Sequence, residues 1–253
     1  MLELIAVLAA SALAGFVDAV VGGGGLVLVP ALFSAYPGAA PATLFGTNKA
    51  AAVWGTAWSC AQYFKRIQLS VRSLLPAVAM AGAGSWVGAG LVSRVDATDL
   101  RRALPLVLVG LLAYTLTRKD LGSQHAPRWR GGRQAMAAAA IGLVIGVYDG
   151  FFGPGTGSFL VFLFVRVLGY DFLHASAAAK LLNTATNSAA LVRFSIAGQV
   201  WWEIGLMLAV ANVAGSLIGT RLALRHGSGF VRGMFVVVVS ALILKTGYDG
   251  YLR

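Results

Sequence analysis

The chain has 253 residues, of which 58% are hydrophobic and 11% are charged, and its formal net charge is +11 at pH 7. A soluble domain carries roughly 25% charged residues, so this composition excludes a soluble domain of any size. The positive charge does not indicate nucleic-acid binding, because Lys and Arg gather at the ends of apolar segments, as the positive-inside rule predicts. The single Cys60 excludes an internal disulfide and a Cys-based metal cluster.

Apolar segments follow one another along almost the whole chain. In the first half they cover about residues 2–21, 25–37, 42–64, 70–92 and 100–117. In the second half they cover about residues 134–151, 155–169, 173–194, 201–224 and 229–247. The first segment lacks the basic start of a signal peptide, so we expect it in the mature protein. The sequence therefore predicts an all-α, polytopic membrane protein.

The second half of the chain repeats the first at one offset of 131 positions. The related pairs of identical residues include Asp18 and Asp149, Lys49 and Lys180, Gln68 and Gln199, and Arg101 and Arg232. So many coincidences at one offset favour a duplication. We predict a first membrane repeat over 1–117, a basic cytoplasmic linker over 118–133 and a second membrane repeat over 134–253.

The short second segment of each half decides the topology. At 1.5 Å per residue it is on the order of 20 Å long, less than a bilayer core of about 30 Å. If it continues the preceding segment as one broken span, each half has four crossings and the repeats are parallel. If it returns as a hairpin arm, each half has five crossings and the repeats are inverted. The length of the preceding segment favours inversion, with about eight spans that include or accompany broken or re-entrant helices.

Each half carries a glycine-rich break after an acidic residue. Gly costs about 1 kcal/mol and Pro about 3 kcal/mol in a helix interior, so neither run is comfortable helix. A helix that restarts after a break directs free N–H groups and a positive dipole end at an anion. The alternative is close helix packing, which we favour for Gly84, Gly88, Gly215 and Gly219. The predicted substrate-binding residues in the breaks are Gly22, Gly23, Gly24, Gly25, Gly153, Gly155, Thr156 and Gly157.

Two lysines lie inside apolar segments, where an unpaired cation costs at least about 2.5–3.5 kcal/mol. Lys49 follows Thr47 and Asn48, and Lys180 shares a helix face with Asn183 and Asn187. All six are predicted to bind substrate. The structural alternative is that each lysine forms a buried ion pair with Asp18 or Asp149, which we assign to charge balance or proton coupling. The two interpretations are compatible, because an arriving anion can release a lysine from its carboxylate.

The remaining polar residues favour structural roles. Arg193 lies near a segment end and is expected to anchor the helix at the interface. His125, His174 and His226 are scattered at segment ends without metal-ligand spacing, so we predict neither a metal site nor a cofactor.

These motifs resemble the TauE/SafE family, the sulfite exporter or toluenesulfonate-uptake permeases. The resemblance rests on Gly15-Phe16-Val17-Asp18 with its glycine run, on Gly46-Thr47-Asn48-Lys49, and on Tyr148 to Gly157 with Lys180 and Asn183 to Asn187. It covers essentially the full length, and the second-half motif is the more specific. The resemblance implies a bacterial plasma-membrane permease for sulfur-containing or related organic anions.

The leading hypothesis is a secondary transporter that exports a small anion, most simply sulfite or a sulfonate, across the bacterial inner membrane. The alternatives are an uptake permease or channel of the same architecture, an accessory membrane subunit and a membrane-embedded enzyme. The sequence offers no nucleophile, metal motif or acid–base pair typical of an enzyme, so we do not expect enzymatic activity. The expected partners are a small anion and the lipid bilayer. Substrate, direction, coupling ion and oligomeric state stay open at this stage.

Overall fold

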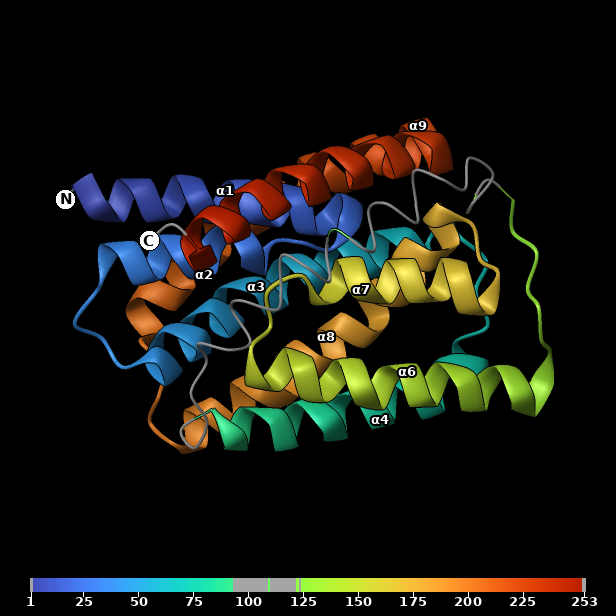
Figure 1. Cartoon of the computed structure of the whole chain (residues 1–253), viewed down its shortest axis with the longest axis horizontal. Helices are drawn as coiled ribbons and strands as arrows, with labels where there is room; N and C mark the ends of the chain where they lie inside the picture. The colour runs from blue at the N-terminus through green and yellow to red at the C-terminus, as the bar shows by residue number, and fades with distance from the viewer. Residues whose placement is uncertain (1, 93–108, 110–121, 123, 252–253) are drawn as a thin grey trace.

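The computed structural model describes residues 2–92, 109, 122 and 124–251, and within these ranges all regular structure is helical. Figure 1 shows the helices lying roughly side by side along the long axis of the molecule. They are α1 (Leu2–Val21), α2 (Gly25–Ala35), α3 (Pro41–Phe64), α4 (Val71–Leu91), α6 (Gly131–Phe151), α7 (Thr156–Leu163), the π-helix η1 (Phe164–Leu168), α8 (Phe172–Ile196) and α9 (Trp202–Tyr251). The predicted all-α class is confirmed. The predicted segment 100–117, except residue 109, and linker residues 118–121 and 123 lie outside the described residues.

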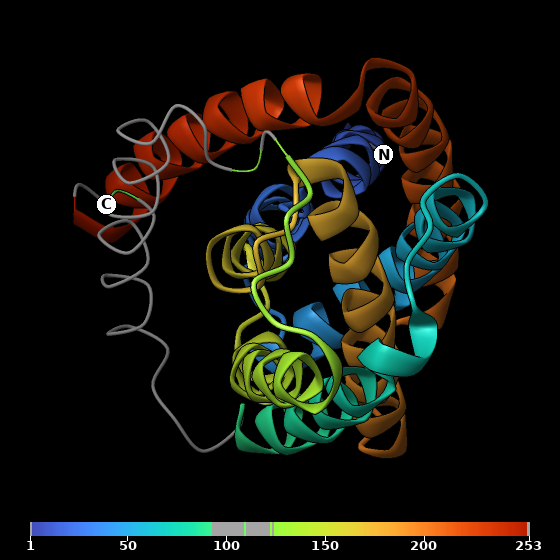
Figure 2. The same cartoon turned by 90° about the vertical axis from the view of Figure 1, so that its right-hand side faces the viewer.

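Four helices in the described part of the chain are long and apolar enough to cross a membrane. They cover Glu3–Val21, Val71–Leu91, Gly131–Phe151 and Trp202–Ala241. The last range contains Gly227, whose backbone is not helical (φ 72°), so α9 is two helices that meet at a kink. The two predicted segments 201–224 and 229–247 correspond to these parts. In the end-on view of Figure 2, the part after the kink (red) lies across one side of the bundle.

The outer helices pack in two close pairs, α4 with α6 and α1 with α9. Small residues make the close approach possible. A Cβ on Gly84 would lie 2.5 Å from the carbonyl oxygen of Leu143 on α6, and a Cβ on Gly219 would lie 2.5 Å from that of Phe16 on α1. The prediction that these glycines serve helix packing is confirmed.

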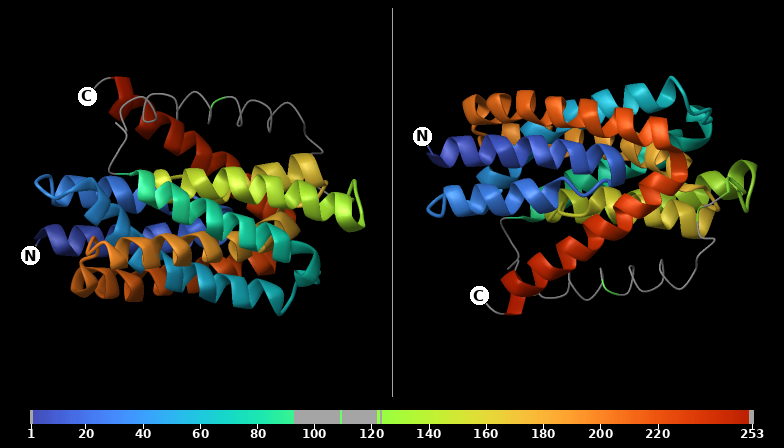
Figure 3. Two further views of the ribbon diagram at one scale, coloured as in Figure 1. Left: turned by 90° about the horizontal axis from the view of Figure 1, so that it is seen from below. Right: turned by 90° about the horizontal axis from the view of Figure 1, so that it is seen from above.

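Three helices of the second half begin at a constant distance in sequence from three helices of the first half. The first residues of α7, α8 and α9 follow those of α2, α3 and α4 by 131 positions each. In Figure 1, α1 runs away from the N-terminus, and α6 runs in the opposite direction. In both places the next short helix, α2 or α7, turns back beside its predecessor, and the right-hand view of Figure 3 also shows this for α1 and α2. The short segments therefore return as hairpin arms.

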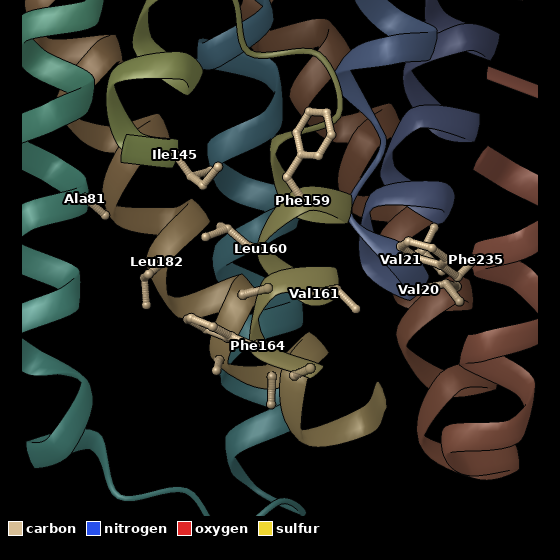
Figure 4. Close-up of a cluster of buried hydrophobic side chains, with 14 of the residues drawn as sticks. Val20, Val21, Ala81, Ile145, Phe159, Leu160, Val161, Phe164, Leu182 and Phe235 are labelled. Carbon is tan, nitrogen blue, oxygen red and sulfur yellow. The ribbon is translucent and has the colours of Figure 1, made fainter. Parts of the chain in front are cut away.

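Helix α7 lies in the centre of the protein. Its first six residues, Thr156 to Val161, are buried, and Leu160 and Val161 pack in the main hydrophobic core with Phe164 and Leu182 (Figure 4). A helix of eight residues is too short to cross a bilayer. The unpaired backbone groups at its ends are tolerated at membrane depth because protein, and not lipid, surrounds them. This burial places the start of α7, and with it the second break, deep inside the fold.

Candidate functional site

The two glycine-rich breaks contact each other. The Gly22 carbonyl accepts a hydrogen bond of 2.7 Å from the Ser158 backbone N–H, and Gly157 packs directly on the Gly22 backbone. Gly22, Gly153 and Gly155 have φ values of 79°, 86° and 84°, which residues with a side chain rarely adopt. The left-handed backbone explains why glycine occupies these positions.

The first ion pair joins α3 to α6. Lys49 Nζ lies 2.6 Å from Asp149 Oδ2, and the two side chains are only 4% and 2% exposed. The same ammonium donates to Asn187 Oδ1 on α8 at 3.0 Å. Both partners of Lys49 are side chains, so each can turn away by rotation about its own bonds.

The second ion pair joins α8 to α1. Lys180 Nζ lies 3.2 Å from Asp18 Oδ2 and also donates to the main-chain carbonyl of Asp18, at the end of α1. Thr56 on α3 donates to the same carboxylate oxygen at 3.1 Å. Each pair thus joins a lysine of one half of the chain to an aspartate of the other, as the structural alternative anticipated for buried lysines.

A cavity lies between the breaks and the first ion pair. The space open to water is about 30 Å³, whereas one water needs roughly 10–15 Å³ on the same measure, so the cavity has room for a few waters. The predicted residues that line it are Asp18, Gly22, Gly24, Gly25, Asn48, Lys49, Asp149, Gly153, Gly155, Thr156, Gly157, Asn183 and Asn187. The starts of α2 and α7 both face this cavity, which is the arrangement that favours an anion.

The structure places three other predicted residues away from the cavity wall. Gly23 and Lys180 do not line it. Thr47 donates to the Thr43 carbonyl within α3 and accepts a hydrogen bond of 3.1 Å from the Trp201 backbone N–H. The Thr47 hydroxyl therefore connects α3 to the residues before α9.

Four further residues line the cavity without having been predicted. They are Ala14, Leu28, Ala52 and Asn212. Asn212, on α9, is 3% exposed and donates from Nδ2 to the Ser11 carbonyl at 3.2 Å. An amide in the middle of the apolar segment 201–224 was a signal that could have identified it, because such groups are costly in lipid.

Asn48 presents an unsatisfied atom beside the cavity. The side chain is 5% exposed, and Oδ1 is the one buried side-chain polar atom among the described residues without a hydrogen-bond partner. An unpaired buried polar atom costs about 1–3 kcal/mol, so it indicates a position where a ligand or water makes the missing bond.

The prediction that the histidines are scattered is wrong for two of them. The rings of His125 and His174 stack with centroids 3.9 Å apart, and His174 Nδ1 lies 2.8 Å from Asp171 Oδ2. Burial, and next the neighbouring His174, lower the pKa of His125. The fold brings His125, from the residues before α6, to the start of α8, which sequence spacing could not reveal.

Comparison with known proteins shows the family of the chain. The sequence matches the family described as sulfite exporter TauE/SafE over residues 7–246. It is 37% identical over 239 residues to the probable membrane transporter protein YfcA of Escherichia coli, covering 94% of this chain and 87% of that protein. It is 33% identical over 240 residues to the probable membrane transporter protein ORF9 of Sinorhizobium sp, covering 93% and 89%.

A third relative, a probable membrane transporter protein of Haemophilus influenzae, is 30% identical over 253 residues, covering 98% of this chain and 96% of the relative. No solved structure matches the chain. The names of the family and of its members point to transport and not to catalysis. The chain belongs to the sulfite exporter TauE/SafE family of membrane transporters.

Proposed function

We propose that this protein is a secondary transporter that exports small anions, most simply sulfite, sulfonates or related sulfur-containing organic anions, across the bacterial inner membrane. The observation that carries the proposal is the buried cavity in which Lys49 and the starts of two helices face the same space. Helix starts supply N–H groups and a partial positive charge, and the amides of Asn183 and Asn187 add donors without adding charge.

Exchange of partners explains how such a site can hold and release an anion. Two lysines and two aspartates balance one another while the site is empty of substrate, so the resting site carries no net side-chain charge. An anion that takes the place of Asp149 pairs with the Lys49 ammonium. When the Asp149 carboxylate returns to Lys49, it displaces the anion. The cavity offers about 30 Å³ to water, so it must widen to admit a sulfonate.

Two inverted repeats supply the alternating access that a transporter needs. The constant spacing of 131 positions and the opposite directions of α1 and α6 support this arrangement. Helices α3 and α8, with 24 and 25 residues, have the length to cross, and they carry the polar residues of the site. With them the described helices and the predicted segment 100–117 account for about eight spans, plus the hairpin arms α2 and α7.

The distribution of basic residues gives the orientation. The α3–α4 loop, the residues before α6 and the kink of α9 lie at one end of the molecule, on the right in Figure 1. This end carries Lys65, Arg66, Arg72, Arg128, Arg130, Arg133 and Arg225. The positive-inside rule assigns it to the cytoplasm, so α1 begins on the periplasmic side. Anion export from a cell that is negative inside is downhill by about 2.3 kcal/mol per charge for each 100 mV.

A flux assay tests the function. The purified protein is reconstituted in liposomes loaded with sulfite, a sulfonate or a carboxylate, and efflux is followed under an imposed potential or pH gradient. We expect efflux of the sulfur oxyanions that depends on the gradient and is lost in Lys49→Ala, with the surface variant Lys65→Ala as the matched control. Flux only in the inward direction would favour the uptake permease, and flux that is independent of any gradient and never saturates would favour a channel. The absence of flux for every anion would overturn the proposal.

A further inference from the structure

We propose that His125, Asp171 and His174 form a binding site for one divalent transition-metal ion, such as Zn²⁺, at the end of the molecule that carries the basic loops. Nothing in the transport site requires these residues, because they lie at the junction of η1, α8 and the segment before α6. Two imidazoles and one carboxylate are a donor set that zinc and its neighbours prefer.

The distances suit a metal ion with a small adjustment. One donor atom from each of the three residues lies within 4.8 Å of the others. Bonds of about 2.0–2.2 Å to zinc hold neighbouring donors roughly 3.3 Å apart. His174 Nδ1 and Asp171 Oδ2 already lie 2.8 Å apart, so an ion can replace the proton that they share. The neutral imidazole of His174 then carries its hydrogen on Nε2.

His125 supplies the third donor by turning its ring. The stacked rings make an interplanar angle of 26°, so their lone pairs lie in nearly parallel planes in this conformation and have to be turned toward one point. His125 is exposed, so rotation of its side chain meets little resistance. Asp171 and His174 retain 13% and 23% exposure, which leaves a path for an ion from solvent.

The backbone around the cluster holds the three residues in place. The Ala126 and Arg128 N–H groups donate to the carbonyls of Gly169 and Leu168, both at 2.9 Å, and so fix the segment that carries His125. Asp171 caps α8, because its Oδ1 accepts from the His174 backbone N–H at 2.7 Å. This contact leaves Oδ2 for the metal. The nearby arginines raise the cost of a cation, but the cluster faces water, where salt screens that repulsion.

Metal binding would join two parts of the chain that are distant in sequence. One ligand comes from the segment between the predicted repeats, and two come from the start of α8, which carries Asn183 and Asn187 farther along. A bound ion therefore stiffens the connection between this segment and a helix that lines the cavity.

Titration of the full-length, detergent-purified protein with Zn²⁺, and with Co²⁺ as a spectroscopic probe, tests the site after removal of any affinity tag. We expect one ion per chain and the visible absorption of Co²⁺ bound to nitrogen ligands. His125→Ala and His174→Ala should each weaken binding by roughly tenfold or more. Asp171→Asn keeps the α8 cap and should weaken binding likewise, while His226→Ala, which changes an exposed histidine on α9, is the matched control.

Two outcomes would overturn this proposal and leave the transport function untouched. One is the absence of Zn²⁺ binding to protein that elutes as a single folded species. The other is binding of equal strength in the control and in all three ligand variants, which would assign the ion to a different place.

Discussion

The two buried ion pairs consist of residues that the same offset of 131 positions relates, yet their surroundings differ. Among the described residues Lys49 bonds only to side chains, those of Asp149 and Asn187, and it lines the cavity. Lys180 bonds to the Asp18 carboxylate and to its main-chain carbonyl, and it does not line the cavity. A side-chain partner can rotate away, whereas a main-chain carbonyl moves only with its helix. The difference indicates that the first pair exchanges partners during transport and that the second holds the end of α1 in place.

The largest expected effect comes from disturbing the contact between the two glycine-rich breaks. Gly22→Ala forces a side chain onto the Gly157 backbone and a residue with φ of 79° into strain. We expect a loss of at least about 2 kcal/mol of folding free energy and a large loss of folded protein, because backbone here cannot move aside. Size-exclusion chromatography in detergent and thermal unfolding measure both. Gly38→Ala, where nothing lies within 4 Å of the added Cβ, is the control. Equal yields of the two variants would show that the breaks do not form the rigid centre of the fold.

The next largest effects come from replacing each lysine, which tests whether that lysine exchanges partners during transport or stabilises the fold. Lys49→Ala should lower anion flux per folded molecule by about tenfold or more, since it removes a charge-assisted contact worth roughly 1.5–3 kcal/mol. Either replacement leaves a buried carboxylate unpaired at a cost of about 3–5 kcal/mol. Lys180→Ala also removes the contact that holds the end of α1, so it should lower folded yield and flux in the same proportion. Flux in liposomes, normalised to folded protein, gives both ratios.

The lysine comparison has two ways to fail. If Lys49→Ala also loses yield and flux together, both lysines are structural members of ion pairs, and the anion has another site. If Lys180→Ala keeps its yield and loses flux, the two halves act symmetrically, and the difference in hydrogen bonding between the pairs has no functional consequence.

A smaller and more specific change follows from the aspartates. Asp149→Asn leaves Lys49 with excess positive charge beside the cavity, so anion affinity should rise, on the order of tenfold, while turnover falls because release becomes harder. Asp18→Asn leaves Lys180 bonded to the main-chain carbonyl, so affinity should change less. Binding of labelled sulfite and steady-state efflux measure the two quantities.

Proton coupling is the competing role for the same carboxylates. If Asp149 carries a proton in exchange for the anion, Asp149→Asn should abolish flux driven by a pH gradient and preserve exchange of labelled for unlabelled anion. Loss of both kinds of flux would contradict charge balance as well as proton coupling.

The breaks and the buried charges could be predicted from the sequence because their costs are local. Runs of glycine interrupt a helix wherever they occur, and Lys49 in an apolar segment needs a partner in any fold. Which aspartate pairs with which lysine depends on helix packing, and so does the exclusion of Lys180 from the cavity. Asn212 and the stacked pair of His125 and His174 come from segments distant in sequence, and no periodic pattern connects them.

The smallest expected effect concerns Asn48, and it sharpens the asymmetry between the two halves. The position 131 residues later is Ala179, so the second half already places an alanine where the first half has this amide. Because Asn48 Oδ1 has no partner, Asn48→Ala removes a buried polar atom whose missing bond costs about 1–3 kcal/mol, which offsets the small void left behind. We therefore expect thermal stability to stay the same or rise slightly.

Anion binding should respond to Asn48→Ala in the opposite sense. If the amide hydrogen-bonds the anion or a water that carries it, apparent affinity should fall by about twofold to tenfold, the equivalent of one hydrogen bond of roughly 0.5–1.5 kcal/mol. Thermal stability and anion affinity must be measured on the same preparation. Only a variant that keeps or gains stability and loses affinity identifies an amide whose missing hydrogen bond is made by the ligand. A variant that loses stability and keeps its affinity would assign Asn48 to packing between α3 and its neighbours. The asymmetry of the site would then be confined to the two ion pairs.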